Sequence, residues 1–241
     1  MFGLGTLINT AAIVLGGILG GLFGKLLKER HQDGLSKACG ICVLFIGIAG
    51  ALEGMLTVSD GKVLGGRALL IVGCLALGGL IGELINIEHG FERFGEWLKR
   101  KTGNSKDRRF VEGFVTASLT VCIGAMAIVG AIEDGLTGDF SILLTKAVLD
   151  LIIIMVMTCS LGKGCIFSAI PVFLLQGSVT ALAVLIKPLM TDAALGNLSM
   201  IGNILIFCVG VNLVLGKKIR VANLLPAIIL AAAAAFLPFS L

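Results

Sequence analysis

The chain has 241 residues, of which 57% are hydrophobic and 14% are charged, and its formal net charge at pH 7 is +4. Soluble domains contain about 45–50% apolar and about 25% charged residues, so this composition excludes a soluble enzyme, a disordered chain and a secreted disulfide scaffold. The 34 glycines are about twice the usual share. We therefore expect a polytopic membrane protein.

Long apolar stretches recur along the whole chain. A bilayer core about 30 Å thick requires roughly 20 apolar residues per helix, and backbone groups in lipid must be hydrogen-bonded within their own segment. The alternation typical of membrane barrels is not seen. The predicted fold class is all-α, one membrane domain over residues 1–241 with about eight transmembrane helices. The predicted spans are residues 4–27, 38–56, 68–87, 110–132, 142–161, 165–186, 198–215 and 224–239.

Most of the 19 lysine and arginine residues fall in every second loop, and the other loops are acidic or nearly neutral. The positive-inside rule therefore predicts a multi-pass protein with basic loops in the cytoplasm and both termini outside. These loops also explain the net positive charge, so no nucleic-acid partner is expected. No basic residue precedes the first apolar run, which predicts a retained helix rather than a cleaved signal peptide.

Similar segments end the first and third predicted spans, at residues 20–27 and 78–85, and the second and fourth, at residues 48–54 and 128–135. Their similarity predicts that residues 1–58 and 62–138 are related hairpin repeats, arranged in tandem and parallel, although glycine-rich composition alone could produce the likeness. Residues 142–239 form the second half of the bundle, where the fifth and seventh spans both finish on Leu-Gly-Lys. Glycines spaced four apart allow close helix packing in lipid, and they favour self-association into a homo-oligomer.

The loop at residues 88–109 separates the third and fourth spans on the basic side. Within it, Phe91, Phe94, Trp97 and Leu98 share one helical face and charged residues share the other. This pattern predicts an interfacial amphipathic helix on the cytoplasmic leaflet. Docking of a protein partner is the alternative interpretation.

Two charged residues lie inside the predicted span 142–161. Lys146 and Asp150 are four residues apart, so both lie on one helical face and can pair. Ionisable groups within a membrane span are costly and indicate functional sites by default. A purely structural ion pair and a coupling site in a transport path both remain open.

Further polar residues fall in the last spans. Gln176 follows Pro171, and a proline inside a helix frees a backbone carbonyl, as at the binding sites of many transporters. Asn203 and Asn212 lie in the seventh predicted span. We assign these four residues, with Lys146 and Asp150, to a candidate transport path, and interhelical hydrogen bonding is the alternative.

Glu53 and Glu133 occupy equivalent positions in the two predicted repeats, near the outer ends of their spans. They are candidates for an outer vestibule, with solvated helix ends as the alternative. No nucleotide-binding, zinc-protease or hydrolase motif is present, and the cysteines lie in or beside apolar spans. The sequence therefore predicts no enzymatic activity, no catalytic residue, no metal site and no cofactor.

Several segments together carry a resemblance to a known family. They are residues 121–130, which read Val-Cys-Ile-Gly-Ala-Met-Ala-Ile-Val-Gly, and residues 168–171, 210–212 and 223–227. In these the chain resembles the YdfK/YqgA-like family of bacterial membrane proteins, which carries a domain-of-unknown-function label. The resemblance covers nearly the whole chain and implies a location in the bacterial cytoplasmic (inner) membrane. It assigns no substrate.

The leading functional expectation is a transporter or channel for an ion or small polar solute. The alternative is a membrane scaffold or signalling protein without transport activity. The expected partners are the lipid bilayer, an unidentified ion or small molecule, and a second copy of the chain.

Overall fold

The computed structural model of the chain describes residues 3–59 and 61–236. Its regular structure is helical apart from one antiparallel β-hairpin, which confirms the predicted all-α fold. In chain order the elements are α1 (Leu4–Gly24), α2 (Glu29–Met55), β1 (Leu56–Ser59), β2 (Lys62–Gly65), α3 (Ala68–Ile85), α4 (Ile87–Lys101), α5 (Phe110–Cys122), α6 (Ala125–Thr137), α7 (Ser141–Leu161), the 3-10 helix η1 (Lys163–Ser168), α8 (Ala169–Ala181), α9 (Ala183–Ile186), η2 (Lys187–Leu189), α10 (Asp192–Leu215), η3 (Val221–Leu224) and α11 (Pro226–Ala234).

Six segments of the described chain are long and apolar enough to cross a membrane: α1, α2, α3, α7, the continuous pair η1–α8, and α10. A seventh span results if α5 and α6, which form a bent pair at 62°, are counted together. The last apolar helix, Val221–Ala234, is shorter, and residues 237–239 of the predicted eighth span lie outside the described residues. The structure thus has six to seven spans, and the count of eight stays a prediction.

The span predicted at residues 110–132 is interrupted between α5 and α6. Ile123 is extended, and Gly124 has φ 149° and ψ 144°, a backbone conformation that residues other than glycine rarely adopt. The last carbonyl groups of α5 therefore lack the helical N–H donors that a continuous helix would supply. This break lies in the middle of the residues on which the family resemblance rests.

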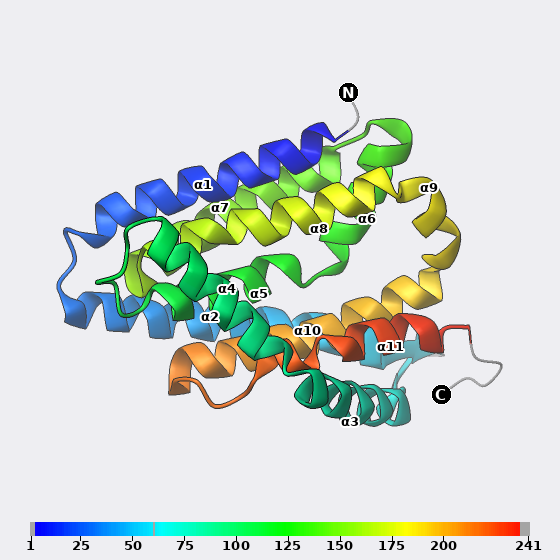
Figure 1. Ribbon diagram of the computed structural model, residues 1–241. Coiled ribbons are helices and arrows are strands. Elements are labelled where there is room, and N and C mark those ends of the chain that lie inside the picture. The colour runs from blue at the N-terminus through cyan, green and yellow to red at the C-terminus, as the bar shows by residue number, and fades with distance from the viewer. Residues whose placement is uncertain (1–2, 60, 237–241) are drawn as a thin grey trace.

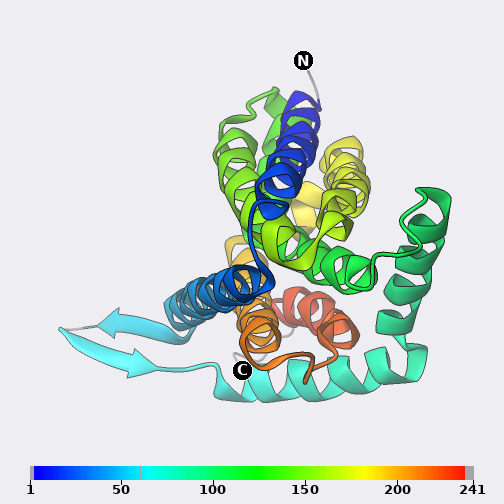
Figure 2. The same ribbon diagram turned by 90° about the vertical axis from the view of Figure 1, so that its left-hand side faces the viewer.

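The helices form two groups, which Figures 1 and 2 show from two sides. One group contains α1, α6, α7 and α8, and the other contains α2, α3, α10 and α11. The most extensive helix–helix contacts are those of α1 with α7 and of α2 with α10. The consecutive helices α1 and α2 thus each pack mainly on a helix far away in the sequence. The relation of residues 1–58 and 62–138 as hairpin repeats stays a prediction.

Glycines let the backbones of these paired helices approach each other closely. A Cβ atom added at Gly16 or Gly20 of α1 would collide with the backbone carbonyl oxygens of Leu151 and Met155 of α7. Small residues at four-residue spacing let helix backbones approach in this way without a hydrophobic driving force. Part of the glycine richness of the sequence therefore reflects backbone-to-backbone packing between the helices.

The C-terminal ends of α7 and α10 share a local geometry. Gly162 ends α7 with φ 86° and ψ −171°, and Gly216 ends α10 with φ 76° and ψ 173°. Each glycine is followed by a 3-10 helix and then by a helix with proline in its first turn, Pro171 or Pro226. The shared Leu-Gly-Lys motif thus corresponds to the same unusual turn, which only glycine adopts readily.

The loops with most of the basic residues gather at one end of the bundle, at the left of Figure 1, and we call this the basic end. The turns α1–α2, α7–η1 and α10–η3 all lie there, while the start of α1 lies at the opposite end. Helix α4 lies beside the basic end and packs on α5 and η3. Its Phe94 and Trp97 rings stack at 5.7 Å and remain 39% and 47% exposed, whereas Leu98 is buried.

Candidate functional site

The charged pair inside α7 is buried in the structure. The side chains of Lys146 and Asp150 are only 9% and 5% exposed. The Nζ atom of Lys146 donates to both carboxylate oxygens of Asp150, at 2.8 Å to Oδ1 and 2.6 Å to Oδ2. Two opposite charges thus lie together within a membrane-spanning helix, as the four-residue spacing predicts.

The helix break supplies a third partner for this pair. Lys146 Nζ also donates to the backbone carbonyl of Val121 at 2.9 Å. Val121 lies in the last turn of α5, directly before the break at residues 123–124, so its carbonyl is available to a side chain. The interrupted span therefore contributes backbone to the site, an arrangement tolerated at membrane depth only inside protein or beside a cavity.

Two amide side chains complete the cluster. Asn9 Nδ2 of α1 donates to Asp150 Oδ2 at 3.1 Å and to Gln176 Oε1 of α8 at 3.2 Å. Asn9 and Gln176 are 0% and 1% exposed. We call Asn9, Lys146, Asp150, Gln176 and the Val121 carbonyl the polar centre. It joins α1, α5, α7 and α8.

The polar centre contains two unsatisfied atoms. Asn9 Oδ1 and Gln176 Nε2 are buried and have no hydrogen-bond partner within the described part of the chain. The orientation of the Asn9 amide is fixed by Asp150, because turning it would direct its oxygen at the carboxylate. An unsatisfied buried polar atom costs about 1–3 kcal/mol. One acceptor and one donor are thus available next to the ion pair, and a bound group that both donates and accepts would satisfy them.

The sequence prediction placed three other residues in the same path, and the structure places them elsewhere. Asn203 donates to the Ser199 carbonyl of its own helix, α10, at 2.8 Å and packs against Gly50 of α2. Pro171 is the third residue of α8, so it begins this helix, where its missing N–H is tolerated, and does not interrupt it.

Asn212 has a local role at the end of α10. Its Nδ2 donates to the Ile219 carbonyl at 2.7 Å, and its Oδ1 accepts from the backbone N–H groups of Lys218 and Ile219, both at 2.9 Å. These three bonds satisfy the backbone of the α10–η3 turn. Asn212 therefore shapes this turn and does not contact the polar centre.

The two acidic residues predicted for an outer vestibule, Glu53 and Glu133, do not interact with each other in the structure. Glu53 is exposed on α2, Glu133 is half-buried on α6, and no hydrogen bond or ion pair between them occurs among residues 3–59 and 61–236. The neighbouring Asp134 is fully buried and accepts from the backbone N–H groups of Gly3 and Gly5, at 3.2 and 3.0 Å. It caps the N-terminus of α1, a role that sequence reasoning missed.

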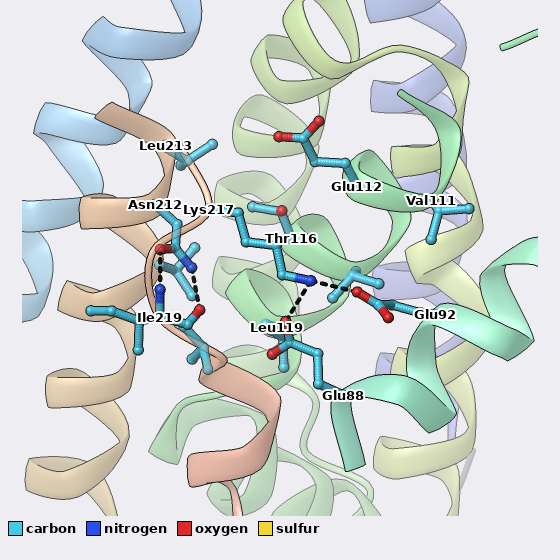
Figure 3. A pocket seen from close by; sticks show the side chains of 13 residues that line it. Glu88, Glu92, Val111, Glu112, Thr116, Leu119, Asn212, Leu213, Lys217 and Ile219 are labelled. Atoms are coloured by element: carbon cyan, nitrogen blue, oxygen red, sulfur yellow. Dashed lines mark hydrogen bonds and ion pairs between the residues drawn. The ribbon is translucent and has the colours of Figure 1, made fainter. Parts of the chain in front are cut away.

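A second polar cluster lies at the basic end, in a cavity of about 320 Å³ between α4, α5, α10 and η3. Figure 3 shows Lys217 reaching toward the carboxylates of Glu88 and Glu92 of α4. Lys217 Nζ lies 2.8 Å from Glu88 Oε1 and also pairs with Glu92. Partial burial alone would lower the pKa of Lys217, but its bonds to the two carboxylates outweigh burial and raise it. We call this space the α4 cavity, and sequence reasoning did not find it.

Helix α5 connects the two features. Glu112, Thr116 and Leu119 of α5 line the α4 cavity, and Val121, whose carbonyl binds Lys146, follows two residues after Leu119. Helix α5 thus contributes residues to both sites.

Comparison with known proteins agrees with the resemblance in the sequence. Residues 4–236 match the family described as "Protein of unknown function (DUF554)". The chain is 33% identical over 226 residues to "Uncharacterized membrane protein YdfK" of Bacillus subtilis (strain 168), covering 94% of this chain and 93% of the relative. It is 31% identical over 232 residues to "Uncharacterized protein YqgA" of Escherichia coli (strain K12), covering 95% and 94%. No solved structure matches the chain. The chain therefore belongs to the DUF554 family of membrane proteins.

Proposed function

We propose that the protein is a transporter or channel for an ion or small polar solute, and that the polar centre is its substrate site. The observation that supports this most directly is the Lys146–Asp150 pair, held at the carbonyl of a broken span beside an unsatisfied donor and acceptor. In this proposal the protein lies in the bacterial cytoplasmic membrane with its basic end inside and both termini outside.

Stability alone is a poor explanation for such a pair. Replacing a buried ion pair by well-packed apolar residues is often neutral or stabilising, because removing two charges from water is costly. Ionisable residues inside membrane proteins face the bundle interior and often form ion paths or proton relays. Broken helices that present backbone carbonyls are likewise typical of transporter binding sites. Both features meet at Lys146 in this chain.

The chemistry of the polar centre suits an exchange in which a substrate replaces the ammonium group of Lys146. Lys146 occupies oxygen atoms of Asp150 and Val121 that would otherwise be free to bind a cation or a hydrogen-bond donor. When the ammonium group moves aside, an entering cation or polar solute takes these oxygens, and Asn9 Oδ1 with Gln176 Nε2 supplies one further acceptor and donor.

Flux measurements on purified protein in proteoliposomes test the proposal. The panel comprises inorganic ions, amino acids and organic acids, and an internal pH dye reports proton movement. Asp150→Asn and Gln176→Ala are expected to reduce a demonstrated flux at least about tenfold, the change that accompanies loss of about 1.4 kcal/mol of binding free energy.

Asn203→Ala is the matched control, because Asn203 is also a polar residue within a span, but among the described residues its side chain bonds only within its own helix. Its flux is expected to equal that of the unchanged protein. Flux that is unaffected by Asp150→Asn and Gln176→Ala would show that the polar centre is not the substrate site.

A second candidate function is a scaffold or signalling role without transport, and the exposed Phe94–Trp97 stack of α4 is the observation that favours it. This role predicts that Phe94→Glu with Trp97→Glu abolishes a co-purified complex while any flux persists. The same rings suit the membrane interface, where aromatic side chains are enriched.

A further inference from the structure

We propose that the α4 cavity is a binding site for a small organic cation, a primary amine on a short apolar chain, with the ammonium group held between Glu88 and Glu92. This site is separate from the polar centre and does not depend on transport.

The size and walls of the cavity suit such a ligand. Its volume of about 320 Å³ falls within the range of small-molecule sites, which is about 300–1,000 Å³. Such sites combine apolar walls with a few polar groups that set the orientation of the ligand. The apolar walls here are Val111, Val115, Leu119, Val209, Leu213 and Val221.

The charge in the cavity favours a cation over an anion. Glu88, Glu92 and Glu112 line the space, against the single ammonium group of Lys217. Three carboxylates against one ammonium group give the lining an excess of negative charge. A positively charged ligand therefore gains electrostatic attraction that a neutral molecule of the same shape does not.

The carboxylate of Glu88 is held in place. Glu88 is 4% exposed, its backbone N–H donates to Asn223 Oδ1 at 2.8 Å, and its Oε2 accepts from the Ala222 N–H at 3.3 Å. Its other oxygen, Oε1, is the one that receives the ammonium group of Lys217 at 2.8 Å. A buried, fixed carboxylate with one oxygen directed at an ammonium group is a preformed site for that group.

Lys217 itself resembles the proposed ligand, because its side chain is an ammonium group on a four-carbon chain. The side chain is 52% exposed, so it can rotate into solvent, whereas Glu88 is confined. A second hollow of about 450 Å³ adjoins the same Glu88, Glu92 and Lys217, and its wall also contains Lys218 and Arg220, of which Arg220 pairs with Glu83 at 2.8 Å. An amine would take the place of the Lys217 ammonium group at Glu88 and Glu92.

The test is calorimetric titration of the purified full chain in nanodiscs with n-butylammonium chloride, and n-butanol serves as the uncharged probe of matching length. Lys217→Met removes the internal competitor and is expected to tighten butylammonium binding about tenfold, the factor for a site that Lys217 occupies about nine-tenths of the time. Glu88→Gln is expected to weaken binding at least about tenfold. Glu92→Gln, at a more exposed position, provides the same test if Glu88→Gln does not fold.

The proposal is overturned if Lys217→Met binds butylammonium no more tightly than the unchanged protein, or if butanol binds as well as butylammonium. It is also overturned if neither glutamate substitution weakens binding in a folded variant. Gln176→Ala is expected to bind butylammonium normally, because Gln176 lies in the polar centre. Binding that persists in this variant while flux is lost separates the two proposals.

Discussion

Asp150→Asn is expected to destabilise the protein strongly, because it leaves the ammonium group of Lys146 buried without its anion. The Lys146 side chain is 9% exposed and would retain only the Val121 carbonyl and the new amide oxygen as acceptors. Removing one partner of a buried pair typically costs about 3–5 kcal/mol.

Unfolding in mixed micelles with increasing SDS fraction provides the measurement. Labelling of the buried thiols of Cys74, Cys159 and Cys165 reports loss of the folded state. The double variant Lys146→Met with Asp150→Leu removes both charges and is expected to recover most of the stability that Asp150→Asn loses.

The exposed pair Lys37–Asp33 is the control, since its side chains are 53% and 61% exposed. Asp33→Asn is expected to change the free energy of unfolding by less than about 1 kcal/mol. The reasoning is refuted if Asp150→Asn costs no more than Asp33→Asn, or if Lys146→Met with Asp150→Leu recovers none of the stability that Asp150→Asn loses.

Two further predictions concern packing and pH. Gly16→Ala places a methyl group against the α7 backbone and should destabilise the protein by about 1–3 kcal/mol, whereas Gly73→Ala, with nothing within 4 Å, should be neutral or stabilising by up to about 1 kcal/mol in the same SDS titration. The raised pKa of Lys217 implies stability that is fully present below the usual value of 10.5 and is lost as pH rises through the raised value. The melting temperature should therefore fall more steeply above about pH 10 than that of Lys217→Met, and parallel curves would contradict this.

Composition and spacing predicted the general architecture, because the cost of unpaired backbone groups in lipid leaves few structural choices. The spacing of Lys146 and Asp150 within one helix likewise predicted their contact, since an i,i+4 pair depends only on local geometry. The break at Gly124 was not predicted. A glycine inside an apolar run looks the same in the sequence whether it packs a helix, as Gly16 does, or interrupts one.

Sequence patterns could not predict hydrogen bonds between residues in distant segments of the chain. Asn9 lies 141 positions from Asp150, and no local pattern indicates that α1 packs on α7. The same limitation explains the interpretations of Asn203 and Asn212. A polar residue in a span could bond to its own helix, a turn or a neighbouring helix, and only the fold decides among these.

The pairing of α1 with α7 also has a consequence for the order of events during synthesis. The chain between Gly24, where α1 ends, and Ser141, where α7 begins, must be made before the two helices can meet. At about 5–20 residues per second this takes roughly 6–23 s. For that time Asn9 lacks both of its partners, and the glycine face of α1 remains uncovered. Nascent chains that stop before α7 are therefore expected to be degraded faster by membrane proteases than the full chain.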